Sequence, residues 1–231
     1  ASIDTTTEMS LVVAESERRA LLDLSGAPPE RVTVVPIGVD LAAFAPDETL
    51  RIAETLVFSG KLSYHANDSA AFLLASEIMP LVWQRRPEAR LRIVGPGASG
   101  GLRAFAVQSR GRIEVTGPVP NMGRELNRAA LAVAPLPYAA GMQFKVLEAL
   151  ACGLPVVASP PAARSFAATE NDGLLTADGP QATAAAILRL LGDAPLQQKL
   201  GRAGRAWVSA HHDWRQIGAE LIAVYEAVRR P

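Results

Sequence analysis

Lys145 and Glu148 are the side chains of this sequence whose types and spacing best fit a chemical role. In a helix, residues at this spacing lie on the same face. Gly141 precedes them in a turn, and free backbone N–H groups and the dipole at a helix start favour an anion. A lysine in the first helical turn is mildly unfavourable without such an anion. A phosphate at the turn, with a carboxylate one turn further on for sugar hydroxyls, is the arrangement needed to grip a nucleotide diphosphate.

The surrounding residues predict the elements that position this pair. Residues 131–136 and 155–159 are short apolar runs typical of buried strands, and residues 143–151 between them are expected to form a helix. Ligands of parallel sheets bind beyond the carboxyl ends of the strands. The turn between the first strand and the helix is therefore predicted to face a ligand.

The same alternation of strand and helix extends along the chain. Residues 10–25 predict a strand then a helix, and residues 31–44 a strand then a turn. Further strands are expected at 55–60, 91–95, 113–117 and 173–177, and helices at 68–86, 100–109, 121–130, 180–192, 195–210 and 214–229. Apolar runs without strict alternation indicate a parallel sheet covered on both faces. The predicted fold is therefore α/β, with a Rossmann-like doubly wound parallel sheet.

Gly60 and Lys61 follow the predicted strand at 55–60. A cation at this position, with Lys145 opposite, could bracket two phosphates. A lone lysine is usually a solvated surface residue. Its position beyond the carboxyl end of a strand favours the binding role.

The stretch GMQFKVLEALACGLPVVAS (141–159) resembles the donor-binding segment of family 4 retaining glycosyltransferases, which have the GT-B fold. Glu148 matches the second Glu of the family pattern, and Lys145 matches the version that carries a Lys before the Leu-Glu pair. The first Glu of the pattern falls on Ala140, so that carboxylate is missing. Further matching segments, in the same order, are RVTVVPIGVD (31–40), FSGKLSYHANDSAAFLL (58–74), LRIVGPG (91–97), VTGPV (115–119) and GRAGRAWVSAHHDW (201–214).

The resemblance implies a C-terminal half of a GT-B glycosyltransferase that transfers a sugar from a nucleoside diphosphate sugar to an acceptor with retention. Residues 1–45 would be the remnant of the N-terminal domain and the linker, and residues 46–231 the nucleotide-sugar-binding domain with its C-terminal helices. The implied site residues fall into three groups. Diphosphate would be bound by Gly60, Lys61, Gly141, Met142, Gln143 and Lys145, ribose by Glu148, and the base by Val119, Leu136 and Tyr138.

The resemblance also sets expectations about partners. The catalytic residues on the acceptor side are expected in the N-terminal domain, so this chain alone should bind donor without turnover. Apart from that domain, the expected partners are the nucleotide-sugar donor and a carbohydrate or lipid-linked acceptor. No cofactor or metal is expected. The expected setting is bacterial polysaccharide biosynthesis, in the cytoplasm or at the cytoplasmic face of the membrane.

Composition and charge exclude several other classes of protein. Lys+Arg and Asp+Glu both number 23, so nothing favours a general nucleic-acid binder. The single cysteine, Cys152, excludes an internal disulfide framework, and its place between a helix and a buried strand predicts packing rather than catalysis. His65, His211 and His212 lack metal-ligand spacing, so no metal site is indicated. Arg85, Arg86, Arg90 and Arg92 are interpreted as a solvated charge run.

Three alternatives remain open from the sequence. One is another GT-B sugar-nucleotide enzyme, such as an epimerase. The second is a NAD-binding oxidoreductase, because Gly95–Gly100 reads Gly-x-Gly-x-x-Gly after a strand, with Glu114 further on. Against this, Pro96 stiffens the turn and Glu114 falls in the middle of its strand. The third is a degenerate, non-catalytic nucleotide-binding domain, which the missing carboxylate at Ala140 would fit.

Overall fold

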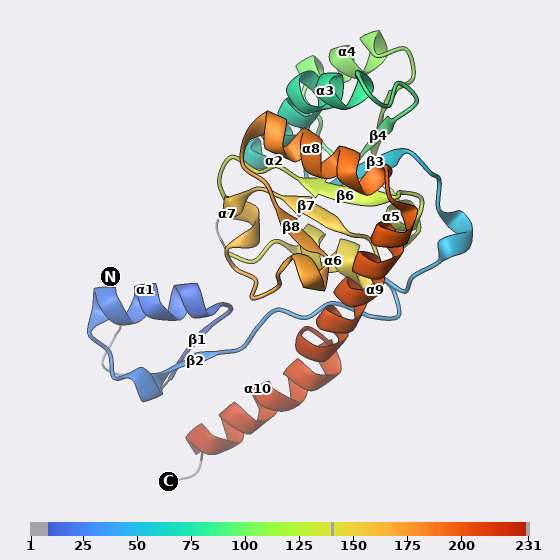
Figure 1. Cartoon of the computed structure of the whole chain (residues 1–231). Helices are drawn as coiled ribbons and strands as arrows, with labels where there is room; N and C mark the ends of the chain where they lie inside the picture. The colour runs from blue at the N-terminus through green and yellow to red at the C-terminus, as the bar shows by residue number, and fades with distance from the viewer. Residues whose placement is uncertain (1–8, 140, 230–231) are drawn as a thin grey trace.

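A six-stranded parallel sheet forms the centre of the computed structural model, which describes residues 9–139 and 141–229 (Figure 1). Its strands are β3 (Thr55–Ser59), β4 (Arg90–Val94), β5 (Ile113–Gly117), β6 (Leu131–Ala134), β7 (Val156–Ala158) and β8 (Leu174–Thr176). They lie in the order β5-β4-β3-β6-β7-β8. This order reverses direction between β3 and β6, and such a switch point opens a crevice at the carboxyl ends of the two strands. The predicted doubly wound α/β sheet is confirmed.

Helices cover both faces of this sheet. They are α2 (His65–Leu73), a π-helical segment (Leu74–Ile78), α3 (Met79–Trp83), α4 (Gly100–Gln108), α5 (Met122–Asn127), α6 (Phe144–Ala151), α7 (Pro160–Ala163), α8 (Gly179–Leu191), α9 (Ala194–His211) and α10 (Trp214–Arg229). Short 3₁₀ turns lie at Pro29–Arg31, Glu48–Leu50 and Glu170–Asp172. The π-helical segment and α3 pack against α8, whereas α6 packs against β6, β7 and α9. The strands are apolar because helices bury them from both sides; Leu56 and Val57, for example, have no exposed surface.

The helix predicted at 68–86 differs from the structure in two ways. It begins earlier, at His65, and a π-helical segment separates α2 from α3. Pro80 lies at the start of α3 and cannot donate a backbone hydrogen bond, and an interruption of the α-helical ladder accommodates this loss. The helix predicted at 121–130 is shorter, and α7 was not predicted.

A separate two-stranded parallel sheet precedes the large domain. It consists of β1 (Ser10–Val12) and β2 (Val32–Val34), joined by α1 (Glu15–Ser25). These three elements were predicted from the sequence, but the pairing of the two strands was not. Figure 1 shows this N-terminal unit set apart from the six-stranded sheet, with α10 extending away from the large domain. The assignment of residues 1–45 to another domain stays a prediction, and residues 1–8 of that range lie outside the described residues.

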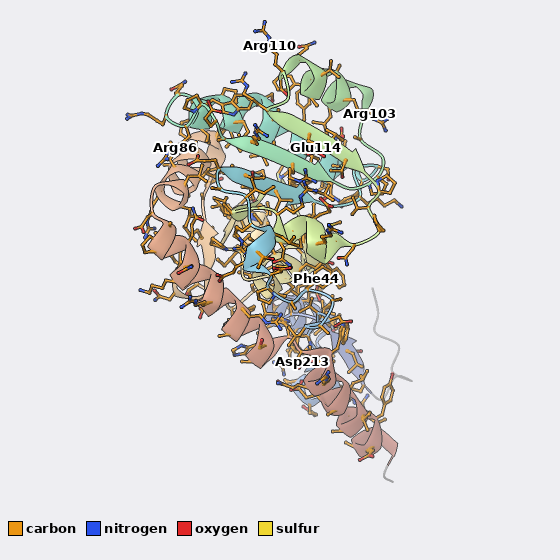
Figure 2. All side chains as sticks on the ribbon, turned by 90° about the vertical axis from the view of Figure 1, so that its right-hand side faces the viewer. Phe44, Arg86, Arg103, Arg110, Glu114 and Asp213 are labelled. Atoms are coloured by element: carbon orange, nitrogen blue, oxygen red, sulfur yellow. The ribbon has the colours of Figure 1, made fainter. Side chains whose placement is uncertain are left out.

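Two polar residues, Arg92 and His212, are buried in the structure. Arg92 is only 7% exposed and forms ion pairs with Glu114 and Glu125 (Figure 2 labels Glu114), because a charge inside a sheet needs partners. The interpretation of Arg92 as part of a solvated run is therefore wrong. His212 is 5% exposed, and its Nδ1 is 2.7 Å from the carbonyl oxygen of Ile37. Cys152 is fully buried as predicted, and burial raises the pKa of its thiol to about 12.

Candidate functional site

A pocket of about 370 Å³ lies at the carboxyl end of the sheet, beside the switch point between β3 and β6. Its walls come from the loop after β3, the loop after β4, the start of α5 and the start of α6. The lining residues are Ser59, Gly60, Lys61, Asn67, Gly95, Pro96, Met122, Met142, Gln143, Phe144, Lys145 and Glu148. The fold therefore gathers four distant segments of sequence around one cavity, where ligands of doubly wound sheets bind.

Most of the predicted diphosphate and ribose residues meet in this pocket. Gly60 and Lys61 come from the β3 side, and Met142, Gln143, Lys145 and Glu148 from the α6 side. Gly141 is not among the described residues that line it. The carbonyl of Gly141 accepts hydrogen bonds from the Gln143 side chain and from Ser165 Oγ. Binding by these residues stays a prediction.

Lys145 is a half-buried cation in the wall of the pocket. Its Nζ donates to Oε1 of Gln143 at 3.2 Å and lies 5.9 Å from the ring centroid of Phe58. Burial lowers the pKa of this ammonium from its ordinary 10.5 to about 8, and the nearby Glu148 charge opposes the shift. An ammonium held this way has lost water without gaining a full counter-charge. It is therefore suited to an anionic ligand.

Glu148 lies one helical turn after Lys145 and is also half-buried. Burial raises the pKa of its carboxyl group, and the charge of Lys145 opposes that rise. Within residues 9–139 and 141–229, no hydrogen bond or ion pair to the Glu148 carboxylate is found. A partly desolvated carboxylate without a protein partner can accept hydrogen bonds from the hydroxyl groups of a ligand.

The start of α6 adds backbone donors to the pocket. Gln143 is the N-cap residue in an extended conformation, and its side chain forms no capping hydrogen bond to the backbone. The first N–H groups of a helix have no partner within the helix. With the helix dipole, these groups favour an anion here. The helix begins at Phe144 rather than at Gln143 as predicted, so Lys145 is its second residue.

Asn67 is a site residue that the sequence reasoning did not assign. Because α2 begins at His65, Asn67 belongs to its first turn, is 8% exposed, and donates from Nδ2 to the carbonyl oxygen of Lys61 at 2.9 Å. A Cβ added to Gly60 would lie 3.0 Å from this Nδ2 and 3.3 Å from Cε of Lys145. Asn67 thus fixes the loop that carries Lys61. Met122 and Phe144, the first residues of α5 and α6, were also missed, since an apolar residue at a helix start carries no chemical signal in the sequence.

The three predicted base-binding residues are not among those that line this pocket. Leu136 is 2% exposed, and its carbonyl accepts a hydrogen bond from Ser159 Oγ at 2.7 Å. Val119 is half-buried against the core. Tyr138 is exposed, with its hydroxyl 2.9 Å from Nδ1 of His65. Their assignment to the base stays a prediction.

The glycine loop after β4 has a structural explanation. Gly95 has a φ of +141°, and a Cβ there would lie 2.0 Å from the carbonyl oxygen of Gly60. Gly97 would crowd Ser63 in the same way. Gly100, the third glycine of the dinucleotide pattern, has no heavy atom within 4 Å of an added Cβ, although that pattern uses it for close helix packing. The loop therefore serves the close approach of two strand ends, and nothing here favours the NAD-binding alternative.

The substitution Gly95→Ala should destabilise the protein by roughly 2–4 kcal/mol, because it combines an unfavourable φ with an unavoidable clash at Gly60. Gly100→Ala is the matched control and should be neutral or slightly stabilising. Urea unfolding of the two variants measures the difference. Equal stabilities would show that the two loops can separate at no cost.

No group of three or more His, Cys, Asp or Glu side chains among the described residues could hold a metal ion. None of the helices in the described part of the chain is both long and apolar enough to span a membrane.

Known proteins resemble this chain in sequence. A family model described as "Glycosyl transferases group 1" matches residues 53–193, which include every residue lining the pocket. A D-inositol 3-phosphate glycosyltransferase of Kineococcus radiotolerans is 33% identical, over 94% of this chain and 55% of the relative. A phosphatidyl-myo-inositol mannosyltransferase of Mycobacterium tuberculosis is 29% identical, over 94% of this chain and 59% of the relative. The chain thus spans little more than half the length of these curated relatives.

Solved structures share the fold. A sucrose-phosphate synthase from Thermosynechococcus elongatus superimposes with a TM-score of 0.78 at 22% identity, over 96% of this chain and 59% of that one. The Anabaena protein Alr3699/HepE, crystallised in complex with UDP and glucose, has a TM-score of 0.78 at 16% identity, over 95% of this chain and 63% of that one. At these identities the likeness concerns the fold alone.

Proposed function

The chain belongs to the group 1 glycosyl transferases, and from that premise we propose that it binds the donor of a sugar-transfer reaction. The expected resemblance to GT-B glycosyltransferases is confirmed at the level of family and fold. The proposed donor is a nucleoside diphosphate sugar. The proposed reaction moves the sugar to an acceptor hydroxyl with retention at the anomeric carbon.

One observation carries this proposal: the composition of the pocket at the switch point. Two lysines, Lys61 and Lys145, line it together with the start of α6, so positive charge and backbone donors face the same space. Glu148 adds an acceptor without a partner among the described residues. A diphosphate fits the cationic end and ribose hydroxyls fit the carboxylate. Packing does not explain why Lys145 and Glu148 are partly buried, because burial of a charged group is unfavourable in the absence of a ligand.

In this reaction the bond between the anomeric carbon and the diphosphate breaks, and a bond to the acceptor oxygen forms on the same face of the sugar. The acceptor hydroxyl gives up its proton to the departing diphosphate or to water, and negative charge accumulates on that diphosphate as the bond breaks. Lys61, Lys145 and the N–H groups at the start of α6 would stabilise that charge, which is an effective way to lower the barrier. Glu148 would hold the ribose at a fixed distance from the reacting bond.

The acceptor and its chemistry are proposed to belong to an N-terminal domain. The chain matches only 55% and 59% of the length of the two relatives. Ala140, where the family pattern has its first Glu, lies outside the described residues. The partner set proposed here is the sugar donor, the N-terminal domain and a carbohydrate or lipid-linked acceptor. The proposed setting is the bacterial cytoplasm or the cytoplasmic face of the membrane, in polysaccharide biosynthesis.

Calorimetric titration of this chain with UDP, GDP, ADP and NAD tests the proposal. We expect one nucleoside diphosphate to bind and NAD to give no heat of binding. Incubation with the matching nucleotide sugar and an acceptor mixture should yield no transfer without the N-terminal domain. Failure of every diphosphate to bind would support the degenerate domain, binding of NAD alone would support the oxidoreductase, and isomerisation of the donor sugar would support the epimerase.

A further inference from the structure

The turn that precedes α6 is connected to the junction between the N-terminal unit and the large domain, which we call the hinge. The chain crosses between these parts at residues 35–40 and at the junction of α9 and α10 (Figure 1). The two crossings pair with each other through a bridge between Val39 and Asp213, and the N–H of Val39 donates to the carbonyl of His212 at 2.8 Å. Asp213 is labelled at this junction in Figure 2. His212 Nδ1 also lies 2.7 Å from the carbonyl oxygen of Ile37, which holds its ring against the linker.

The ring of His212 packs in an aromatic cluster with Phe166 and Trp207. Phe166 packs edge-on against both His212 and Trp207, each at 6.4 Å between ring centroids, and Trp207 lies 4.8 Å from His212. His212 and Phe166 are both buried, at 5% and 9% exposed. Close-packed interiors transmit displacement because they contain little free space. A movement of the linker would therefore be transmitted to Phe166 through the ring of His212.

Ser165 precedes Phe166 and contacts the turn before α6. Its Oγ donates to the carbonyl oxygen of Gly141 at 3.1 Å. Met142, which follows Gly141 in this turn, lines the pocket. Met142 also lines a second cavity of about 530 Å³, whose walls include Val13 and Ala14 of the N-terminal unit. A Cβ on Gly141 would lie 3.7 Å from Oε1 of Glu17 in α1. The turn at Gly141 and Met142 thus contacts both the pocket and the N-terminal unit.

We propose that Ser165 is a positioning residue that couples the hinge to the donor pocket through its hydrogen bond to Gly141. Ligand in the pocket fixes the turn, the turn fixes Ser165 and Phe166, and Phe166 sets the positions of His212 and Trp207. The hinge then adopts one orientation when donor is bound. This inference rests on the proposed function, since it requires a ligand in the pocket.

The intrinsic fluorescence of Trp207 provides a readout that a purely structural serine would not change. The probe is UDP, GDP or ADP, whichever binds in the titration above. The Trp207 contribution is the part of the ligand-induced emission change that is lost in Trp207→Phe. We expect a clear Trp207 change in the parent protein. Ser165→Ala should bind up to about 10-fold more weakly, because the ligand must then order a turn that this hydrogen bond no longer holds. It should show no change in Trp207 emission even at saturation.

Ser76→Ala is the matched control, because Ser76 Oγ donates to the carbonyl of Phe72 at 2.8 Å and neither residue lines the pocket. It should bind and respond like the parent. The coupling would be overturned if the ligand-induced change in Trp207 emission persisted in saturated Ser165→Ala. It would also be overturned if that change were absent from the saturated parent protein. Either result would leave the donor site intact. Absence of binding by all three diphosphates would instead overturn the proposed function, and this inference with it.

Discussion

Replacing Lys145 with methionine is expected to weaken nucleoside diphosphate binding by about 1.5–3 kcal/mol, or roughly 10- to 150-fold, because it removes a charged hydrogen-bond donor. The same change should stabilise the ligand-free protein, since burial disfavours the Lys145 ammonium. A rise of about 2–4 °C in melting temperature corresponds to roughly 1 kcal/mol in a domain of this size. Calorimetry and thermal unfolding measure the two effects. Lys199→Met, at an exposed position on α9, should change neither.

The lowered pKa of Lys145 also predicts how binding and stability vary with pH. Because the ammonium loses its proton near pH 8 in the free protein, affinity for a diphosphate should fall as the pH rises through about 8. The folded protein binds fewer protons than the unfolded chain between about 8 and 10.5, so this group makes stability rise with pH across that window. Lys145→Arg should bind without this pH dependence, since a guanidinium stays protonated. An unchanged pH profile in that variant would assign the titration to another group.

The substitution Glu148→Gln is expected to weaken nucleoside diphosphate binding by about 1–2 kcal/mol, or roughly 5- to 30-fold, because an amide accepts hydrogen bonds from ribose less strongly than a carboxylate. The folded pKa of Glu148 is raised, so the wild-type protein loses stability as the pH rises from the ordinary value of 4.5 through the raised one. The variant lacks that loss and should be the more stable protein at pH 7.

A second consequence concerns the lysine. Glu148 is the charge that opposes the lowering of the Lys145 pKa, so its removal should shift the fall in affinity to a pH below 8. Glu77→Gln, at an exposed position outside the pocket, is the matched control and should leave affinity and pH profile unchanged. If Glu148→Gln binds as tightly as the wild type, the ribose lies elsewhere.

The fold was largely predictable because its strands are apolar runs that helices must cover on both faces. Lys145, Glu148 and Gly60 could be placed together because each lies near the carboxyl end of a strand next to the switch point. The local signals of residues 141–148 were strong, since charged residues occupy a helix between two buried strands. The fold and the placement of these three residues therefore follow from sequence periodicity and from the chemistry of helix termini.

Other features of the site and the core depend on tertiary contacts, which sequence periodicity does not reveal. The burial of Arg92 required Glu114 and Glu125, which follow it at distant positions of the chain. The role of Asn67 depends on the early start of α2, and that of Ser165 on an aromatic cluster between the loop and α9. Val119, Leu136 and Tyr138 were taken from the resemblance alone, and none of them is among the residues that line the pocket.

The central pairing of the sheet also determines when this pocket can form during folding. Leu56 of β3 pairs with Leu131 of β6, so the switch point closes only after the intervening β4 and β5 units have been bridged. Forming contacts between residues so distant in sequence costs loop-closure entropy and is slow. A chain that has assembled only β3, β4 and β5 has half of the pocket and should have no affinity for ligand. Ligand affinity is therefore a kinetic marker for completion of the sheet, and excess ligand stabilises the completed state by mass action.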